Sequence, residues 1–287
     1  MSSFGIASSA MLVELSISCW TARKLDKRVS NQVDAENSTR VRAGNYHKNL
    51  LAGTQKLENI VKFAANARAW HNFNTLPWSD KGLRLLPMAN FMAYKERLNE
   101  LENEYGALVQ DFLVSYPNLV SAAAFQLGSL FDRSEYPEVD AISDKFRFNY
   151  VFTPVPTAGD FRIDINEQAK AELEQQYQSN FDSRISGAMK EAWSRLHECL
   201  SHVSERLEDS GEDNKPKVFR DSLVHNAHEL VDMLKVLNVT KDPELERARA
   251  MLAQTFTGLE AKELRESEGA RKGVKAEVDA ILSKFNW

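Results

Sequence analysis

Two long runs of helical apolar spacing constrain the fold of this 287-residue chain more than any other feature. Over residues 88–115 the apolar side chains form a seam with heptad spacing, made of Phe91, Tyr94, Leu98, Leu101, Tyr105, Leu108 and Phe112. Residues 166–207 keep apolar spacings of three and four, and a helix of that length would span ~60 Å. We therefore predict that the two helices pack antiparallel as a long hairpin. The alternative is that a second copy of the chain covers their apolar stripes.

Alternation with a period of two marks three strands. Residues 13–19, 146–152 and 161–165 each alternate apolar and polar side chains. The last two runs are interpreted as a β-hairpin. Because two strands alone are marginal in water, we expect residues 13–19 to join this hairpin across ~130 residues of chain. Residues 75–87 contain two prolines and a glycine around an apolar centre, so we expect a structured loop there.

These elements predict an α+β, mainly α fold. It consists of a long antiparallel helical hairpin, a small antiparallel β-sheet of about three strands and a C-terminal helical part. Pro117 is expected to end the first long helix, and a shorter helix follows at 118–131. We expect three consecutive parts: 1–87 with the first strand and basic helices, 88–207 with the hairpin and the inserted strands, and 218–287 with C-terminal helices. The acidic stretch 208–217 is interpreted as a linker.

Charge is distributed unevenly along the chain. The formal net charge is −5, but residues 1–100 carry 14 Lys and Arg against 8 Asp and Glu, whereas the rest carries 22 against 33. One interpretation is a basic N-terminal face that meets an acidic partner, either a nucleic acid or the acidic half of a neighbouring copy. The other is a solvated surface on which the charges fall unevenly by chance. A dedicated duplex-DNA binder would be more basic overall.

The start of the chain and its cysteines indicate a cytoplasmic protein. Residues 1–15 have no basic segment, and Glu14 interrupts their apolar run, so we expect neither a signal peptide nor a membrane anchor. No window approaches the ~18 apolar residues of a spanning helix. Cys19 and Cys199 lie far apart in the sequence, which fits a reducing compartment and excludes a disulfide framework.

The chain lacks the common catalytic motifs. Its glycines are scattered, and neither GxxxxGK[ST], GxGxxG nor GxSxG occurs. We therefore expect a non-catalytic protein with no cofactor. A metal hypothesis rests on His225, His228 and Glu229, which stand at i, i+3 and i+4 of a predicted helix. The alternative is that these side chains belong to a solvated helix face, and an enzyme or metalloprotein of unrecognised type is kept as a third hypothesis.

Nucleic-acid contact is predicted by basic residues that are interleaved with aromatic ones, because rings stack on bases while cations meet phosphates. The first such group consists of Trp20, Arg23, Lys24, Lys27 and Arg28. The second consists of Arg68, Trp70, His71, Trp78, Lys81 and Arg84. The alternative is that the tryptophans anchor the core and that the cations line the rims of helices.

The loop at residues 78–82, with the sequence WSDKG, is the preferred functional surface in this interpretation. Ser79, Asp80 and Lys81 form a polar cluster between apolar anchors, and loops carry function more often than cores do. The alternative is that Ser79 and Asp80 only cap a local turn.

Five stretches of the sequence carry a resemblance: LSISCWTARKLDKRVS (15–30), AGNYHKNLL (43–51), TLPWSDKGLRLLPMANFMAY (75–94), FTPVPTAGDFRIDI (152–165) and FRDSLVHNAHEL (219–230). On these stretches the chain resembles a family of uncharacterised bacteriophage and prophage proteins of similar length. The resemblance implies a non-virion protein in the cytoplasm of the infected bacterium, and it implies no activity. It also hints at a MoxR-type AAA ATPase as a partner.

The function expected from these observations is that of a phage accessory protein that acts by self-assembly and partner binding. The motivating observations are the missing catalytic motifs, the long seam and the uneven charge. The partners would be a second copy of the chain and a phage or host protein, without a membrane. The second hypothesis is a single-stranded nucleic-acid-binding protein that uses the two groups of cations and tryptophans.

Overall fold

The structure, a computed structural model, describes residues 3–80, 82–156, 167–208, 221–285 and 287. It confirms the predicted class, since the chain is mainly helical with a small antiparallel sheet. The residues cluster into two compact units: unit 1 comprises Met1–Glu14, His71–Tyr94 and Val151–Trp287, and unit 2 comprises Leu15–Trp70 and Lys95–Tyr150. Both units are built from segments that are far apart in the sequence.

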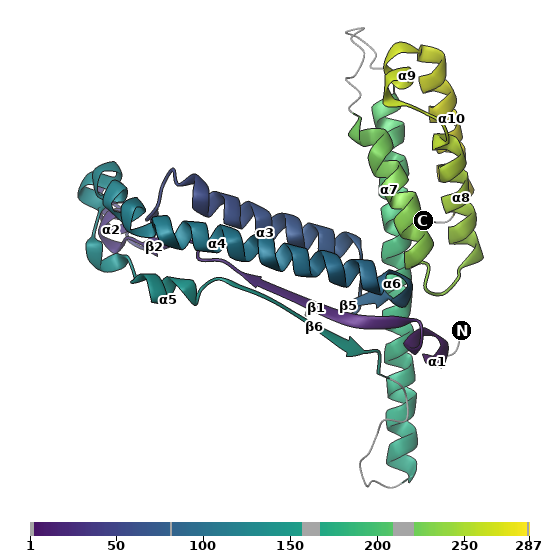
Figure 1. The fold of residues 1–287 in the computed structure, drawn as a ribbon, viewed down its shortest axis with the longest axis horizontal. Helices are drawn as coiled ribbons and strands as arrows, with labels where there is room; N and C mark the ends of the chain where they lie inside the picture. The colour runs from purple at the N-terminus through teal and green to yellow at the C-terminus, as the bar shows by residue number, and fades with distance from the viewer. Residues whose placement is uncertain (1–2, 81, 157–166, 209–220, 286) are drawn as a thin grey trace. The chain divides into compact units, whose positions relative to one another are not determined.

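The main sheet has the strand order β4-β5-β1-β6. Its strands are β1 (Ala10–Ser18), β4 (Leu76–Pro77), β5 (Arg84–Pro87) and β6 (Arg147–Pro154). Two of the predicted strands are thus confirmed, and β1 and β6 are neighbours that run in opposite directions (Figure 1). The third, residues 161–165, lies outside the described residues.

The expectation of a loop over residues 75–87 is wrong in part, because β4 and β5 form there. Leu85 and Leu86 of β5 are buried, and they pair with Leu12 and Met11 of β1 in antiparallel register. Only four residues long, β5 shows too little alternation to be recognised from the sequence, and its pairing with β1 is what makes it a strand.

A smaller two-stranded ribbon lies in unit 2. It is formed by β2 (Arg23–Leu25) and β3 (His47–Asn49), which pair antiparallel. The predicted basic helix follows β2 as α2 (Lys27–Glu36), and the next predicted helix is α3 (Gln55–Phe73). The cations of the first basic group belong to the ribbon and to α2.

The core of unit 1 is built from the second long helix and the C-terminal helices. The elements concerned are α1 (Ser3–Ala7), α6 (Glu167–Leu207), α7 (Ser222–Leu237), α8 (Pro243–Phe256), α9 (Ala261–Glu266) and α10 (Glu268–Lys284). From Phe181 onward, the apolar face of α6 is buried in one cluster with α7, α8 and α10, which lie alongside it (Figure 1). The predicted C-terminal helices are thus present.

The first long helix is longer than the sequence indicates. It runs as α4 (Phe91–Leu127) straight through Pro117, after a 3-10 turn at η1 (Met88–Asn90). The expected end at Pro117 is therefore wrong. Tyr116 is buried, and its hydroxyl donates to the carbonyl oxygen of Pro137 at 3.0 Å, so tertiary contacts hold the helix where the proline weakens it. After α4 come η2 (Gly128–Leu130), η3 (Arg133–Glu135) and α5 (Val139–Ser143).

The seam of α4 is buried within unit 2 against partners other than α6. Tyr105 contacts the rings of Phe63 on α3 and Phe148 on β6, at centroid distances of 6.3 and 5.7 Å. Phe112 contacts Phe146 at 5.6 Å. The expected hairpin, in which the two long helices pack on each other, is thereby corrected, because α6 packs with the C-terminal helices and with β4. Within the described ranges, no helix combines the length and apolar character needed to cross a membrane.

Candidate functional site

The first basic group lies where β2 meets α2 in unit 2. Arg23 and Lys24 belong to β2, while Lys27 and Arg28 form the first turn of α2, and all four side chains are exposed. In the part of the chain that the structure describes, Arg23, Lys24 and Lys27 form no ion pair. Arg28 donates from Nη2 to the carbonyl oxygen of Ser129 at 3.1 Å. We call these four cations the basic junction.

Trp20 of the same group faces the interior of unit 2. Its ring is half-buried and contacts Phe112 and Tyr116 on α4 at 6.4 and 5.9 Å. The packing makes Trp20 an aromatic anchor of α4, as the alternative interpretation expected. The structure thus brings the cations of this group together, while their tryptophan packs on α4.

A buried ion network lies beneath the basic junction. The ammonium of Lys48, whose side chain is 5% exposed, lies 3.4 Å from the carboxylate of Asp26 and 2.6 Å from that of Glu135. It also donates to the carbonyl oxygen of Leu130 at 2.7 Å. Asp26 additionally caps α2 by accepting from the Val29 N–H at 3.1 Å, and this bond holds the pKa of the carboxyl below its usual value.

The network ties three separate segments of unit 2 together. It joins the start of α2, strand β3 and the turn after α4 around one cation. Carboxylates so close to a buried ammonium favour its charged form, and the pKa of Lys48 is raised in spite of its burial. The fixed charges give the base of the basic junction a rigid geometry.

A hollow of about 600 Å³ opens beside the basic junction. Lys27 and Arg28 line it from α2, Lys48 lines it from β3, and Phe131 and Arg133 line it from the turn after α4. Lys48, Phe131 and Arg133 are not among the binding residues predicted from the sequence. No local pattern marks them, because they reach the hollow only through the fold of unit 2.

The second group is divided between the two units, since Arg68 and Trp70 belong to unit 2 whereas His71, Trp78 and Arg84 belong to unit 1. Trp78 is 4% exposed, its ring packs on Phe181 at 5.5 Å, and the Arg184 guanidinium lies 5.6 Å from its ring centroid. Trp70 is half-buried. Ser79 and Asp80 line a second hollow of about 390 Å³ with α6, whereas Lys81 lies outside the described residues.

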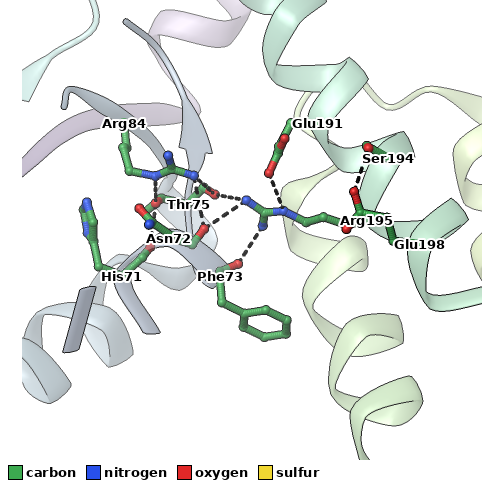
Figure 2. Close-up of polar contacts among 9 residues, drawn as sticks. All are labelled: His71, Asn72, Phe73, Thr75, Arg84, Glu191, Ser194, Arg195 and Glu198. Carbon is green, nitrogen blue, oxygen red and sulfur yellow. Dashed lines mark hydrogen bonds and ion pairs between the residues drawn. The ribbon is translucent and has the colours of Figure 1, made fainter. Parts of the chain in front are cut away.

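Arg84 of the second group points into a polar cluster at the end of α3 (Figure 2). It donates from Nε to Thr75 Oγ1 at 2.6 Å and from Nη2 to the carbonyl oxygens of Asn72 and Thr75. Arg195 of α6 meets the same helix end and donates to the carbonyl oxygens of Asn72, Phe73 and Thr75 at 2.8 to 3.0 Å. The last carbonyls of a helix lack partners within it, so the two guanidiniums complete the C-terminus of α3.

The same cluster contains a buried histidine. His71 Nδ1 and the hydroxyl oxygen of Tyr94 are 2.5 Å apart. Burial, followed by the nearby charge of Arg84, lowers the pKa of His71 to about 4, so the ring is neutral at pH 7. Burial also raises the pKa of Tyr94 above its usual value, so its hydroxyl stays protonated. The pair lines neither of the two hollows, which argues for a structural role.

The metal hypothesis gains no support. His225 and Glu229 are 70% and 53% exposed and lie 3.3 Å apart across one turn of α7, while the His228 ring contacts Phe256 at 6.2 Å. Within the described residues, no group of three or more His, Cys, Asp and Glu side chains is arranged to hold a metal ion.

A Ser–Lys–Asp cluster between α6 and α10 is the nearest approach to a catalytic constellation. Ser204 donates to Asp279 Oδ1 at 2.5 Å, and Lys275 donates to Asp279 Oδ2 at 2.7 Å. The hydrogen bond to Asp279 raises the pKa of Lys275, so the amine stays protonated and cannot act as a base for Ser204. The cluster therefore serves as a bridge between two helices.

Comparison with protein-family models, with curated proteins and with solved structures finds no match to this chain. Inference of a function therefore depends on the geometry of the basic junction and its hollow.

Proposed function

We propose that this chain is a non-catalytic protein that binds single-stranded nucleic acid through the basic junction of unit 2. The observation that carries the proposal is that Arg23, Lys24 and Lys27 are exposed and, among the described residues, have no ion-pair partner. Cations in this state are available to phosphates, and their contact releases the counterions of a strand.

Other cations of the basic N-terminal half are neutralised within the chain, which isolates the basic junction. Lys48 is paired with two carboxylates, Lys56 with Asp111 at 2.7 Å and Arg42 with Asp34 at 3.3 Å. The folded chain thus uses part of its uneven charge for its own ion pairs. Among the exposed cations that remain, four stand together at the junction, whereas others such as Lys62 and Lys95 stand singly in the sequence.

Helix stability does not account for the two cations in the first turn of α2. The N-terminus of a helix carries a partial positive charge and favours carboxylates. Lys27 and Arg28 stand there nevertheless, and the only carboxylate at this terminus among the described residues of α2 and its cap is that of Asp26, which is paired with Lys48. A local departure from a stability rule is expected where function requires it. An anionic partner would relieve the repulsion.

The proposed binding depends on contacts between cations and phosphates, and not on stacking of bases on tryptophan. Trp20 and Trp78, which the sequence offered as stacking platforms, pack on rings of the chain itself. An acidic protein surface is therefore the second candidate, because it too would meet exposed cations. Comparing the binding of an oligonucleotide with that of an acidic peptide distinguishes the two candidates.

Fluorescence anisotropy with a labelled 12-nucleotide oligo(dT) and with a labelled 12-residue polyglutamate tests the proposal. The full chain should bind the oligonucleotide, and log K should fall with log salt with a slope of about −0.7 per phosphate contacted. Replacing Arg23, Lys24 and Lys27 with alanine should weaken binding at least about tenfold and make the slope shallower by about 2. Arg28 is left in place because it holds Ser129.

The matched control replaces Lys62, Lys95 and Lys145, three other exposed cations of unit 2, and removes the same total charge. It should weaken binding by no more than about twofold at 150 mM salt, where screening limits distant charges. Equal losses in the two triple variants would contradict a site at the junction. Tighter binding of polyglutamate than of the oligonucleotide would favour the acidic protein partner.

The setting proposed for this activity is the cytoplasm of an infected bacterium, as the resemblance to phage proteins implies. Self-assembly and a MoxR-type AAA ATPase partner stay predictions of the sequence. Burial of the α4 seam inside unit 2 removes one of the reasons for self-assembly, since that seam is not available to a second copy.

A further inference from the structure

The hollow beside the basic junction combines cations with an aromatic ring. Lys27 and Arg28 line one side, and Phe131 lines it from the turn after α4. We propose that this hollow holds one nucleoside 5′-phosphate, with the base on Phe131 and the phosphate on Lys27 and Arg28. The inference rests on the proposed function and deepens it, because it names the ring that takes the place of the buried tryptophans.

The size of the hollow fits such a ligand. Its volume of about 600 Å³ falls within the ~300–1,000 Å³ that is usual for small-molecule sites. Single-strand binding proteins commonly combine a cationic track for phosphates with a ring for the base, and base stacking tolerates any sequence because every base has a π-face. The hollow provides both parts within one unit of the chain.

The aromatic part is held in place by the fold. The ring of Phe131 packs against that of Tyr136 at a centroid distance of 5.1 Å. Tyr136 is buried, and its hydroxyl donates to the carbonyl oxygen of Leu50 at 2.7 Å. Phe131 itself is half-buried and lines the hollow, so its position is fixed while part of it is accessible.

The cationic part has hydrogen-bond donors that the chain itself does not use. Arg28 commits one Nη2 bond to Ser129, and a guanidinium has five N–H donors, while Lys27 has no partner among the described residues. The neighbouring Lys48 network pairs one ammonium with the two carboxylates of Asp26 and Glu135, so it carries a net charge of −1. Four cations and three carboxylates line the hollow in all, so a net positive charge still faces the ligand.

One further carboxylate, that of Asp132, lines the hollow and would repel a phosphate that approached it. Its Oδ1 accepts from the N–H and the hydroxyl of Ser134 at 2.9 and 2.7 Å, and these bonds lower the pKa of the carboxyl. Asp132 belongs to the turn that carries Phe131, whereas Lys27 and Arg28 belong to α2. This placement favours the orientation with the phosphate at α2 and the base at the turn.

Calorimetric titration of the full chain with AMP, adenosine and ribose 5-phosphate tests the inference. AMP should bind, and each of the two fragments should bind at least about tenfold more weakly, because each lacks one half of the recognition. Phe131→Leu should weaken AMP binding about tenfold, whereas Phe131→Tyr, which keeps a ring, should stay within about twofold. Phe125→Leu is the matched control, since Phe125 is 90% exposed on α4 of the same unit.

Several outcomes would overturn the inference. They are a failure of AMP to bind, equal binding of AMP and ribose 5-phosphate, and equal effects of Phe131→Leu and Phe125→Leu. The comparison of AMP with adenosine and ribose 5-phosphate uses the unaltered protein, so it tests the inference even if Phe131→Leu does not fold.

Oligo(dT) binding to the same variants separates the inference from the proposed function and identifies the source of the nucleotide. Oligonucleotide binding that is lost in the triple junction variant but unchanged by Phe131→Leu would leave the function standing and exclude Phe131 from strand binding. Competition of AMP with the oligonucleotide would identify a nucleotide within a strand as the ligand. AMP binding that depends on Phe131, without any oligonucleotide binding, would identify a free nucleotide and overturn the proposed function.

Discussion

At the scale of single residues, two arginines from distant parts of the sequence complete one helix end. Arg84 and Arg195 direct their guanidiniums at the last carbonyls of α3, and Glu191 accepts from Arg195 Nε at 3.1 Å (Figure 2). A guanidinium suits this task because its fork of donors can serve several carbonyls at once. The cluster therefore joins α3 to α6 within unit 1 by charge-assisted hydrogen bonds.

Replacing Arg195 with methionine should lower the free energy of unfolding by about 2 kcal/mol, because hydrogen bonds to three carbonyls are lost while the apolar stem is kept. Urea denaturation followed by circular dichroism measures this. Arg206→Met, an exposed position on the same helix, is the control and should stay within ~0.5 kcal/mol. A loss no larger than that of the control would show that Arg84 alone completes the helix end.

His71 should make stability depend on pH. Its pKa is about 4 in the folded chain, against the usual 6.5, so the unfolded chain binds more protons between these values. Stability should therefore rise with pH from about 4 to 6.5 and level off above, by about 3 kcal/mol in total from this group. Urea titrations at steps of one pH unit measure the slope.

The comparison with His71→Gln isolates the contribution of this histidine, because the carboxylates of the chain titrate equally in both proteins. The difference between the two unfolding free energies should grow as the pH rises through that window. Asn226→Gln, a substitution of an exposed residue that does not titrate, is the control and should leave the pH dependence unchanged. A constant offset between the unaltered protein and His71→Gln would contradict a neutral buried ring.

At the scale of elements, α4 shows how tertiary contacts override a local signal. Pro117 lacks the N–H of a helix interior and clashes with the preceding turn, yet the helix continues to Leu127. Tyr116 and Phe112, on the buried side of the helix, are held by rings and by the carbonyl of Pro137. The apolar periodicity of α4 predicted its burial, but its length was decided by these partners.

Replacing Pro117 with alanine should raise the free energy of unfolding by about 1–3 kcal/mol, because alanine restores a helix hydrogen bond at an exposed position. Alanine also leaves the unfolded chain more conformational freedom than proline does, and this lowers the free energy of unfolding by less than ~1 kcal/mol. The midpoint of urea denaturation reports the net effect, with Asn118→Ala as the neighbouring control. A lower midpoint would show that the proline itself is needed for the packing of α4.

At the scale of the whole molecule, the assembly state stays a prediction of the sequence. With its seam buried, α4 offers only isolated apolar side chains such as Val114 and Phe125, which are 79% and 90% exposed. They stand about three turns apart on one side of the helix. Self-association, if it uses unit 2, should therefore depend on these two side chains.

Light scattering at micromolar concentration should give a mass above the 32.5 kDa of one chain. Replacing Val114 and Phe125 with serine should return the mass to that of the monomer, whereas Val41→Ser, at another exposed apolar position, should not. A mass of 32.5 kDa at all salt concentrations would end the self-assembly hypothesis.

Sequence periodicity alone determined where most helices and two of the strands lie, and it placed residues 13–19 and 146–152 in one sheet. Such signals are local, since an amphipathic segment records which of its own faces is buried. The sequence also singled out the four cations of the basic junction, because they stand together within six positions of the chain.

Only the tertiary structure decided which rings and charges remain available to a partner. Trp20 and Lys48 have residue types that suit nucleic-acid contact, yet one packs on α4 and the other is matched by Asp26 and Glu135. Phe131 lies beside Lys27 through the fold of unit 2 alone. The physical reason is that pairing and burial depend on which distant segments meet, and a local pattern does not carry that information.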